Sequence, residues 1–219
     1  MGSALADRIV RLGAQWAPQA VEVLVRAFEV EEHFAVVFPR ARRECLGYLM
    51  HMCVHDALRF GRVDALTTDT GRIAATAVWL GPGAWPMGVR RHLASLPFLV
   101  RAAQAGGAAS SLQLARYGLR TEAVHPRVPH WYLFALGVDP QDHGRGLGGI
   151  LLDHGLTFAD QDGVPAWLET QEERTAHWYQ RRGFQQWGPI MEFPGYSSWQ
   201  MLREPQPPAE HPREAPVAG

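Results

Sequence analysis

Residues 130–149 read HWYLFALGVDPQDHGRGLGG and carry more information about the fold than any other stretch of the chain. His130–Val138 is an apolar, aromatic run of strand length, which is typical of a strand at the centre of a sheet. Asp139 and Pro140 end this run, a glycine-rich loop follows at 143–149, and a helix then extends to about Asp160. A strand, a glycine loop and a helix in this order predict an α/β domain with an anion site at the loop.

Glycines at 144, 146 and 149 let backbone N–H groups turn towards a ligand, and the start of the following helix adds the positive end of its dipole. A pyrophosphate suits such a site. A Walker loop is excluded because the chain contains no lysine. The three glycines also match the dinucleotide pattern G-x-G-x-x-G, but the elements before the loop have the wrong order for that fold, and Glu169 fits its acidic position poorly. The loop by itself leaves the cofactor open.

The flanking sequence predicts a single α/β domain over residues 1–203, with six or seven strands. The predicted strands are 8–12, 62–68, 72–80, 130–138, 166–170, 184–187 and 199–202. One predicted helix begins at Pro18. The other predicted helices span 46–57, 149–160 and the segment that ends at Gly183. The Pro-rich residues 204–219 predict a disordered tail.

Residues 81–128 predict a helical insertion between two strands. Leu93, Leu96 and Val100 indicate a helix that is kinked at Pro97, and Gly106-Gly107 interrupts the chain before a weaker helix around 112–119. Long insertions of this kind often form substrate-binding walls or a lid. A pair of helices without such a role fits the pattern equally well.

The composition excludes some functions. The formal net charge is −1, so neither nucleic acid nor an anionic membrane surface is an expected partner. The arginine pairs 42–43, 90–91 and 181–182 are interpreted as solvated surface. All 21 basic residues are arginine and asparagine is absent, which we interpret as the codon bias of a GC-rich bacterial genome.

The cysteines and the start of the chain predict a cytoplasmic protein. Cys45 and Cys53 lie on one predicted helix, about 12 Å apart along its axis, which is too far for a disulfide. Early charges and the absence of an apolar block argue against a signal peptide. His51 and His55 have the i, i+4 spacing of metal ligands, but no second cluster completes a site, so no metal is expected.

Residues 130–184 resemble the coenzyme A-binding core of the GNAT acetyltransferase superfamily, and more closely its puromycin N-acetyltransferase branch. The residues that carry the resemblance, in family order, are Trp131-Tyr132-Leu133, Leu136-Gly137-Val138-Asp139-Pro140, Gly144-Arg145-Gly146-Leu147-Gly148, Val164-Pro165-Ala166, Leu168-Glu169-Thr170, Trp178-Tyr179 and Gly183-Phe184. The resemblance implies a mixed, mostly antiparallel sheet flanked by helices, with two central parallel strands that splay apart.

The resemblance also implies that acetyl-CoA is the co-substrate. The backbone of Leu136, Gly137 and Val138 would bind its pantetheine arm. Thr175, where the family often has Asn, would reach the pantetheine amide through its hydroxyl. The loop that would wrap the pyrophosphate consists of His143, Gly144, Arg145, Gly146, Leu147, Gly148 and Gly149.

Acetyl transfer to an amine needs a neutral amine, a polarised thioester and a proton for the leaving thiolate. Tyr179 suits the last role, because a phenol keeps its proton at pH 7; an aromatic in the core is its structural alternative. Glu169, in a strand of otherwise neutral residues, is the candidate base. An ion pair of Glu169 with an arginine is equally compatible with the sequence.

We therefore expect an N-acetyltransferase for a small-molecule amine, such as a puromycin-like aminoacyl compound, that acts as a monomer or homodimer. An α-amino group with a pKa near 8 needs less help from a base than a lysine amine near 10.4. Trp79, Trp85 and Trp131 are predicted to line an aromatic substrate pocket. A protein or peptide N-acetyltransferase and a non-catalytic acetyl-CoA sensor are the alternatives.

Overall fold

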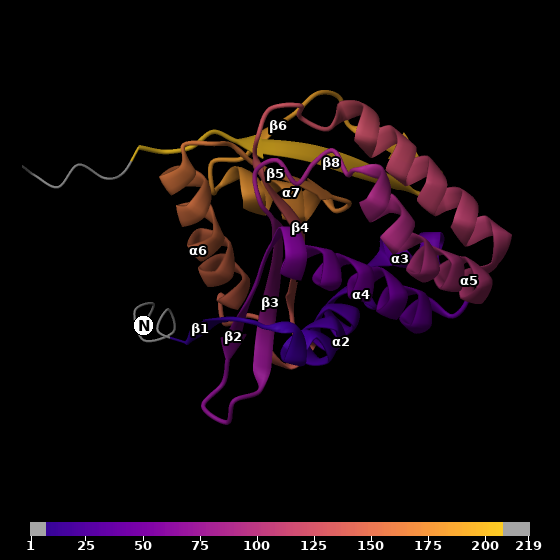
Figure 1. Cartoon of the computed structure of the whole chain (residues 1–219), viewed down its shortest axis with the longest axis horizontal. Coiled ribbons are helices and arrows are strands. Elements are labelled where there is room, and N and C mark those ends of the chain that lie inside the picture. The colour runs from indigo at the N-terminus through magenta and orange to yellow at the C-terminus, as the bar shows by residue number, and fades with distance from the viewer. Residues whose placement is uncertain (1–7, 208–219) are drawn as a thin grey trace, which may run out of the picture.

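The computed structural model describes residues 8–207, and an eight-stranded mixed sheet forms its centre (Figure 1). The strands lie in the order β1-β2-β3-β4-β5-β8-β6, and β7 pairs with β8. Every neighbouring pair is antiparallel except β4–β5, which is parallel. The strands are β1 (Ile9–Arg11), β2 (Gly61–Thr67), β3 (Ile73–Leu80), β4 (Trp131–Val138), β5 (Ala166–Thr170), β6 (Gln185–Gln186), β7 (Met191–Phe193) and β8 (Tyr196–Arg203).

The predicted mixed, mostly antiparallel sheet flanked by helices is confirmed, with eight strands rather than six or seven. The additional strand is β7, whose three residues are too few to show a periodic pattern. It joins β8 through a turn at Gly195, where φ is 89°. Of the predicted tail, only 204–207 lie within the described residues, and there the Gln206 N–H donates to Asp160 Oδ1 (2.7 Å).

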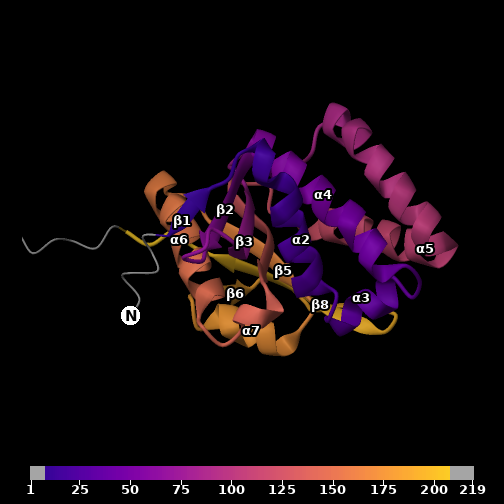
Figure 2. The same cartoon turned by 90° about the horizontal axis from the view of Figure 1, so that it is seen from below.

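Helices cover both faces of the sheet (Figures 1 and 2). One face packs on α2 (Ala17–Phe28) and α4 (Arg42–Phe60), and α5 (Val89–Val124) packs on the outside of α4. The other face packs on α6 (Leu147–Asp162) and α7 (Glu173–Gln180). The short α3 (Glu32–Val37) and the 3-10 turns η1 (Ala14–Trp16) and η2 (Pro140–Asp142) complete the elements.

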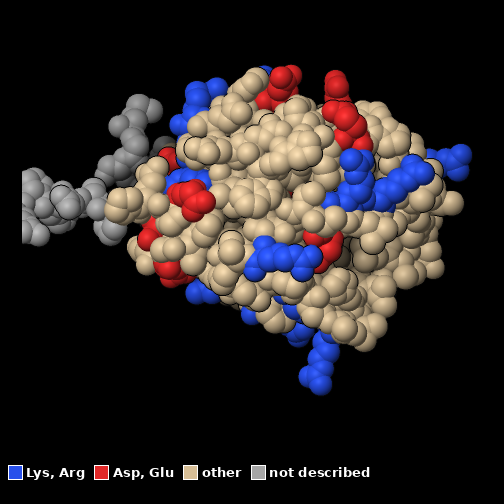
Figure 3. Space-filling model, turned by 90° about the horizontal axis from the view of Figure 1, so that it is seen from above, with Lys and Arg blue, Asp and Glu red and all other residues tan. Residues whose placement is uncertain are grey.

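Surface and core features agree with several smaller expectations. Cys45 and Cys53 are both free and buried. On the face shown in Figure 3, arginine and acidic side chains are interspersed, and much of the surface carries neither. Between residues 8 and 207 no helix is both long enough and apolar enough to cross a membrane.

The helix of the insertion continues through Pro97 and breaks at Gly107, within the predicted interruption at Gly106-Gly107. Pro97 is exposed, so water can bind the carbonyl that loses its N–H partner, and the helix continues. Gly107 adopts φ 80° and ψ −176°, a conformation that only glycine tolerates. Next to it, a side chain on Gly106 would press on Cys45 Sγ at 3.2 Å, so this part of α5 lies close against α4.

A close contact between Gly155 and Trp79 fixes α6 on the sheet. Trp79 on β3 is fully buried, and a Cβ added at Gly155 on α6 would lie 2.4 Å from its ring. Because real Cβ atoms essentially never approach so closely, any side chain at this position must push the helix away from the sheet.

We therefore expect Gly155→Ala to lower the free energy of unfolding by about 1–3 kcal/mol, measured by urea denaturation. Gly47→Ala is the matched control, since Gly47 also lies inside a helix but has no atom within 4 Å of its added Cβ. That control should gain about 0.5–1 kcal/mol from helix propensity. Equal stabilisation by both substitutions would contradict the role of the Gly155–Trp79 contact.

Candidate active site

The parallel pairing of β4 and β5 stops halfway along β4. Pairs are formed by Trp131, Tyr132 and Leu133 with Ala166, Trp167 and Leu168, and the ladder ends there. At this point the register of β4 with β3 shifts, because Leu133 pairs with Trp79 and Ala135 with Val78, which leaves Phe134 as a β-bulge. A bulge bends its strand. The predicted splay of the central parallel strands is therefore present.

A groove of about 550 Å³ and a cavity of about 210 Å³ meet at this splay, and Leu136 lines both. The groove runs from the end of β4 to the start of α6. Most of the predicted cofactor residues line it: Leu136, Gly137, Val138, His143, Gly144, Gly146, Leu147, Gly148 and Gly149.

The loop backbone is open towards the groove. Gly144 and Gly146 have φ of 77° and 75°, and a Cβ added at either would meet no atom within 4 Å. Gly146 is the N-cap of α6 and supplies no side-chain hydrogen bond. The N–H groups at the start of α6 therefore have no capping side chain and are available to an anion.

The remaining two predicted cofactor residues lie elsewhere. Arg145 does not line the groove; its guanidinium Nη1 lies 2.5 Å from Asp142 Oδ1. Thr175 lines the cavity, where its hydroxyl donates to Glu172 Oε2 (3.1 Å). His143 lines the groove, with its Nε2 3.1 Å from the Val138 carbonyl oxygen, so one of its nitrogens is already engaged by the end of β4.

Two arginines of the groove were missed by the sequence analysis. Arg174 and Arg182 both line it. The Arg182 guanidinium lies 3.9 Å above the Trp178 ring and close to the start of α6, since a Cβ added at Gly149 would be 2.7 Å from its Nη2. The pair 181–182 was interpreted as solvated surface, and only the tertiary structure shows that Arg182, just after α7, lines the groove.

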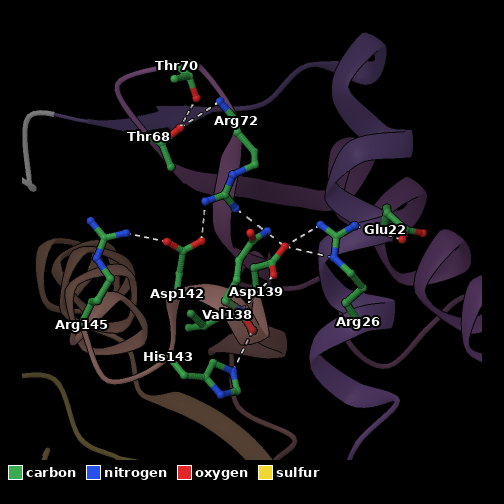
Figure 4. Close-up of polar contacts among 11 residues, drawn as sticks. Glu22, Arg26, Thr68, Thr70, Arg72, Val138, Asp139, Asp142, His143 and Arg145 are labelled. Carbon is green, nitrogen blue, oxygen red and sulfur yellow. Dashed lines mark hydrogen bonds and ion pairs between the residues drawn. The ribbon is translucent and has the colours of Figure 1, made fainter.

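Two buried carboxylates anchor the loop (Figure 4). Asp139 accepts hydrogen bonds from Arg26 Nε (3.0 Å) and Nη2 (2.5 Å), and Arg72 Nη2 lies 2.7 Å from Asp142 Oδ2. Burial raises the pKa of Asp139, but the Arg26 hydrogen bond and that of the Gln141 N–H outweigh it, so the net shift is downward. Asp139 therefore stays ionised and holds the loop at neutral pH.

The cavity brings together both predicted catalytic residues. Tyr179 on α7 and Glu169 on β5 line it. Tyr179 is buried against Trp178 and Phe184, and its hydroxyl makes no hydrogen bond to any residue in the 8–207 range. Burial raises the pKa of Tyr179 above its ordinary value, so the phenol is protonated at neutral pH.

Glu169 makes hydrogen bonds rather than an ion pair with an arginine. Its Oε2 accepts from the Tyr132 hydroxyl (2.6 Å) and its Oε1 from Trp167 Nε1 (3.3 Å). Among the residues that the structure describes, the one basic side chain within 4 Å of the Glu169 carboxyl group is His125, whose Nδ1 lies 3.9 Å from Glu169 Oε1. Burial raises the pKa of Glu169 to about 7, although the two hydrogen bonds oppose this shift.

A second cavity carboxylate, Glu31, was not predicted. Glu31 follows α2 in a segment without periodicity, and it lines both the groove and the cavity. Its Oε2 lies 3.3 Å from His33 Nδ1. Burial, and then the charge of Glu172, raise the pKa of Glu31 to about 8. Burial lowers the pKa of His33 to about 4, so His33 is neutral at pH 7.

The structure does not bring the predicted tryptophans to the cavity. Trp79 is sealed in the core against Gly155, and Trp85 stacks on His125 at 4.4 Å between ring centroids. Trp131 packs on Phe158, and its Nε1 donates to Asp162. Other aromatic residues line the cavity: Phe28, Phe34, Tyr117, Tyr132, Phe134 and Tyr196.

The histidines that were weighed as metal ligands contact each other instead. The rings of His51 and His55 stack with centroids 4.2 Å apart, and His51 also stacks on Phe98. In the described part of the chain, no group of three or more His, Cys, Asp and Glu side chains is arranged to hold a metal ion.

Comparisons with known proteins agree with this geometry. A family model described as "Acetyltransferase (GNAT) family" matches residues 114–184. A mycothiol acetyltransferase from Propionibacterium freudenreichii subsp. shermanii is 41% identical over 59 residues, which cover 26% of this chain and 19% of the relative. The chain thus matches about a fifth of the length of this relative.

Solved structures share the fold over nearly the whole chain. A Corynebacterium glutamicum structure, described as "histone acetyltransferase HPA2 and related acetyltransferase", is 24% identical with a TM-score of 0.68, covering 92% of this chain and 97% of that one. A polyamine N-acetyltransferase from Drosophila melanogaster is 20% identical with a TM-score of 0.59, covering 90% and 98%. Together with the splayed, glycine-looped site, this similarity shows that the chain has the fold of these acetyltransferases, and its residues 114–184 match the GNAT family model.

Proposed function

We propose that the protein transfers the acetyl group of acetyl-CoA to the amine of a small molecule. The main support is the meeting of the groove and the cavity at Leu136, where β4 leaves β5. An acyl donor in the groove and an amine in the cavity would meet at this point.

The groove suits the donor. The loop N–H groups around Gly144 and Gly146, together with Arg174 and Arg182, would hold the phosphates of acetyl-CoA. The β4 backbone beyond Leu133 has no strand partner on the β5 side, so its N–H and C=O groups can bind the pantetheine arm. When bound, acetyl-CoA supplies the acetyl group as a thioester.

The cavity suits a cationic amine without a free carboxylate. Its lining includes Glu31, Glu169 and several aromatic rings, and no arginine is present among the described residues that line it. The charged form of Glu169 and the aromatic faces would both attract an ammonium group. A volume of about 210 Å³ would suit a small amine or the aminoacyl end of a larger compound.

The cavity side chains can supply both proton transfers. Glu169 would take a proton from the acceptor ammonium, which leaves a neutral nitrogen to attack the thioester carbon. Tyr179 would give its phenolic proton to the departing thiolate and regain one from the acetylated nitrogen. Both residues face the same cavity, as this sequence of steps requires.

A thiol-release assay tests the function. With acetyl-CoA, we expect turnover of puromycin-like aminoacyl compounds and of simple alkyl or aryl amines, and slower turnover of the matching free amino acids, because the cavity would leave their carboxylate unpaired. Lysine-rich peptides are the comparison. Turnover of these peptides without turnover of any small amine would favour a protein acetyltransferase, and binding without any turnover would favour a sensor.

The glycine loop gives a binding test with a matched control. At about 100 times its Kd, acetyl-CoA should stabilise the protein by about 2.7 kcal/mol in a thermal melt, and NAD should not. Gly146→Asp should abolish this stabilisation by placing a carboxylate beside the pyrophosphate. Gly163→Asp makes the same change at a positive-φ glycine at the other end of α6, and should leave the stabilisation by acetyl-CoA intact.

The role of Tyr179 is tested by removing one oxygen atom. Tyr179→Phe keeps the ring that packs on Trp178 and Phe184, so the fold should survive. If the phenol protonates the thiolate, kcat should fall by about 10²–10⁴-fold with little change in the KM for acetyl-CoA. Tyr48→Phe, which removes a hydroxyl bonded to Glu44 on α4, should be neutral. A Tyr179→Phe variant with more than half the wild-type kcat would exclude this role.

A further inference from the structure

Two histidines lie directly behind Glu169, outside the cavity. His125 ends α5 and His130 precedes β4, and both are buried. Neither lines the cavity, whereas Glu169 and Tyr132 do. His125 packs on Tyr132 with ring centroids 5.0 Å apart and is covered by Trp85 on its other side. His125 therefore lies next to Glu169 and Tyr132 and not next to the space that a ligand would fill.

Hydrogen bonds fix the protons of both rings. His130 Nδ1 lies 2.7 Å from the Val128 carbonyl oxygen, which can only accept, so Nδ1 carries the proton. Nε2 of the neutral His130 must then be an acceptor. It lies 2.9 Å from His125 Nε2, so this nitrogen is the donor. A neutral His125 therefore has no proton on Nδ1.

Both rings are neutral at pH 7. Burial, and then the neighbouring His130, lower the pKa of His125 to about 3. Burial also lowers the pKa of His130, although its bond to Val128 opposes the shift. The unprotonated Nδ1 of His125 is buried without a hydrogen bond, and Glu169 Oε1 lies 3.9 Å away. A buried acceptor without a donor is costly unless a donor arrives.

We propose that His125 is a positioning residue for Glu169: its Nδ1 accepts a hydrogen bond from the Glu169 carboxyl group once that group has taken a proton, and His130 holds His125 in the required tautomer. The inference rests on the proposed acetyl transfer for its role in catalysis. Hydrogen bonds used in catalysis are commonly long before the reactants bind, which suits the 3.9 Å separation.

The proton balance is simple. An N–H bond of the acceptor ammonium breaks and an O–H bond forms at Glu169 Oε1, which then donates to His125 Nδ1. The neutral nitrogen forms the C–N bond of the amide, while the C–S bond breaks with its electron pair on sulfur. Tyr179 protonates this sulfur and regains a proton from the acetylated nitrogen. The proton on Glu169 leaves to solvent through the cavity with the product. His125 stays neutral throughout and stabilises the protonated form of Glu169.

Other titratable groups line the cavity together with Glu169. Tyr117 from α5, Tyr132 from β4 and Cys53 from α4 line the same cavity, and burial raises the pKa of each, so each keeps its proton. The remaining titratable residues of the cavity lining are Glu31, His33, Tyr179 and Tyr196.

Four variants test the proposal through the pH dependence of kcat. The wild-type rate should rise with pH through about 7, where Glu169 ionises. His125→Leu and His130→Leu should each move this midpoint down by about one unit and lower the plateau by about tenfold, because protonated Glu169 loses its acceptor. His130→Gln should stay near wild type, since its amide can donate to Val128 and accept from His125. His55→Gln, at an exposed histidine on α4, is the control.

Histidine ¹⁵N NMR of the wild-type protein gives a test that needs no activity. We expect the proton on Nδ1 of His130 and on Nε2 of His125, and a His125 Nδ1 shift that follows the titration of Glu169 and loses this response in Glu169→Gln. A proton on His125 Nδ1 at pH 8, or a His130→Gln profile like that of His130→Leu, would overturn the proposal. Absence of turnover with every amine would refute the acetyltransferase activity, and the NMR titration would still decide whether His125 responds to Glu169.

Discussion

The end of the β4–β5 ladder at Leu133 is the constraint on which the rest of the site depends. The bulge at Phe134 bends β4 away, and Gly137 lets α2 press against the strand, since an added Cβ would lie 2.9 Å from the Ala27 Cβ. Both diverging strands stay paired along their outer edges, β4 with β3 and β5 with β8. An opening in the middle of a sheet is thus held by complete ladders on either side, and the groove and the cavity both use it.

Buried ion pairs then hold the glycine loop in place beside the splay. Asp139 and Asp142 are buried at the end of β4, where isolated carboxylates would be costly, and Arg26 and Arg72 reach them from α2 and from the turn between β2 and β3. Three separate segments of the chain therefore converge on the base of the glycine loop. Each carboxylate also has a second arginine nearby, since Arg72 Nη1 lies 3.8 Å from Asp139 Oδ2 and Arg145 Nη1 lies 2.5 Å from Asp142 Oδ1, so several ion pairs hold the loop. A rigid loop presents its N–H groups to an anion without an ordering cost.

The sequence predicted the parts of the site that are local and missed those that depend on tertiary position. The glycine loop, the strand before it and the helix after it are consecutive, so their chemistry could be read directly. Glu31 and Arg182 could not, because a short irregular segment and an arginine on a helix end look like surface until the fold places them. The tryptophan prediction failed for another reason. Trp131 and Tyr132 are adjacent on β4 and face opposite sides of the sheet, and the sequence does not say which of the two faces the cavity.

The two carboxylates of the cavity have different environments, which divides their roles. Glu169 accepts hydrogen bonds from Tyr132 and Trp167, and these favour its charged form, whereas Glu31 faces the like charge of Glu172. Their pKa values are accordingly about 7 and about 8, so Glu169 ionises first as the pH rises. Near neutral pH the cavity then holds one carboxylate that can take a proton and one carboxyl group that mostly retains its own. In the proposed reaction, an entering ammonium would meet Glu169 as its charged acceptor and would lose its proton in that direction.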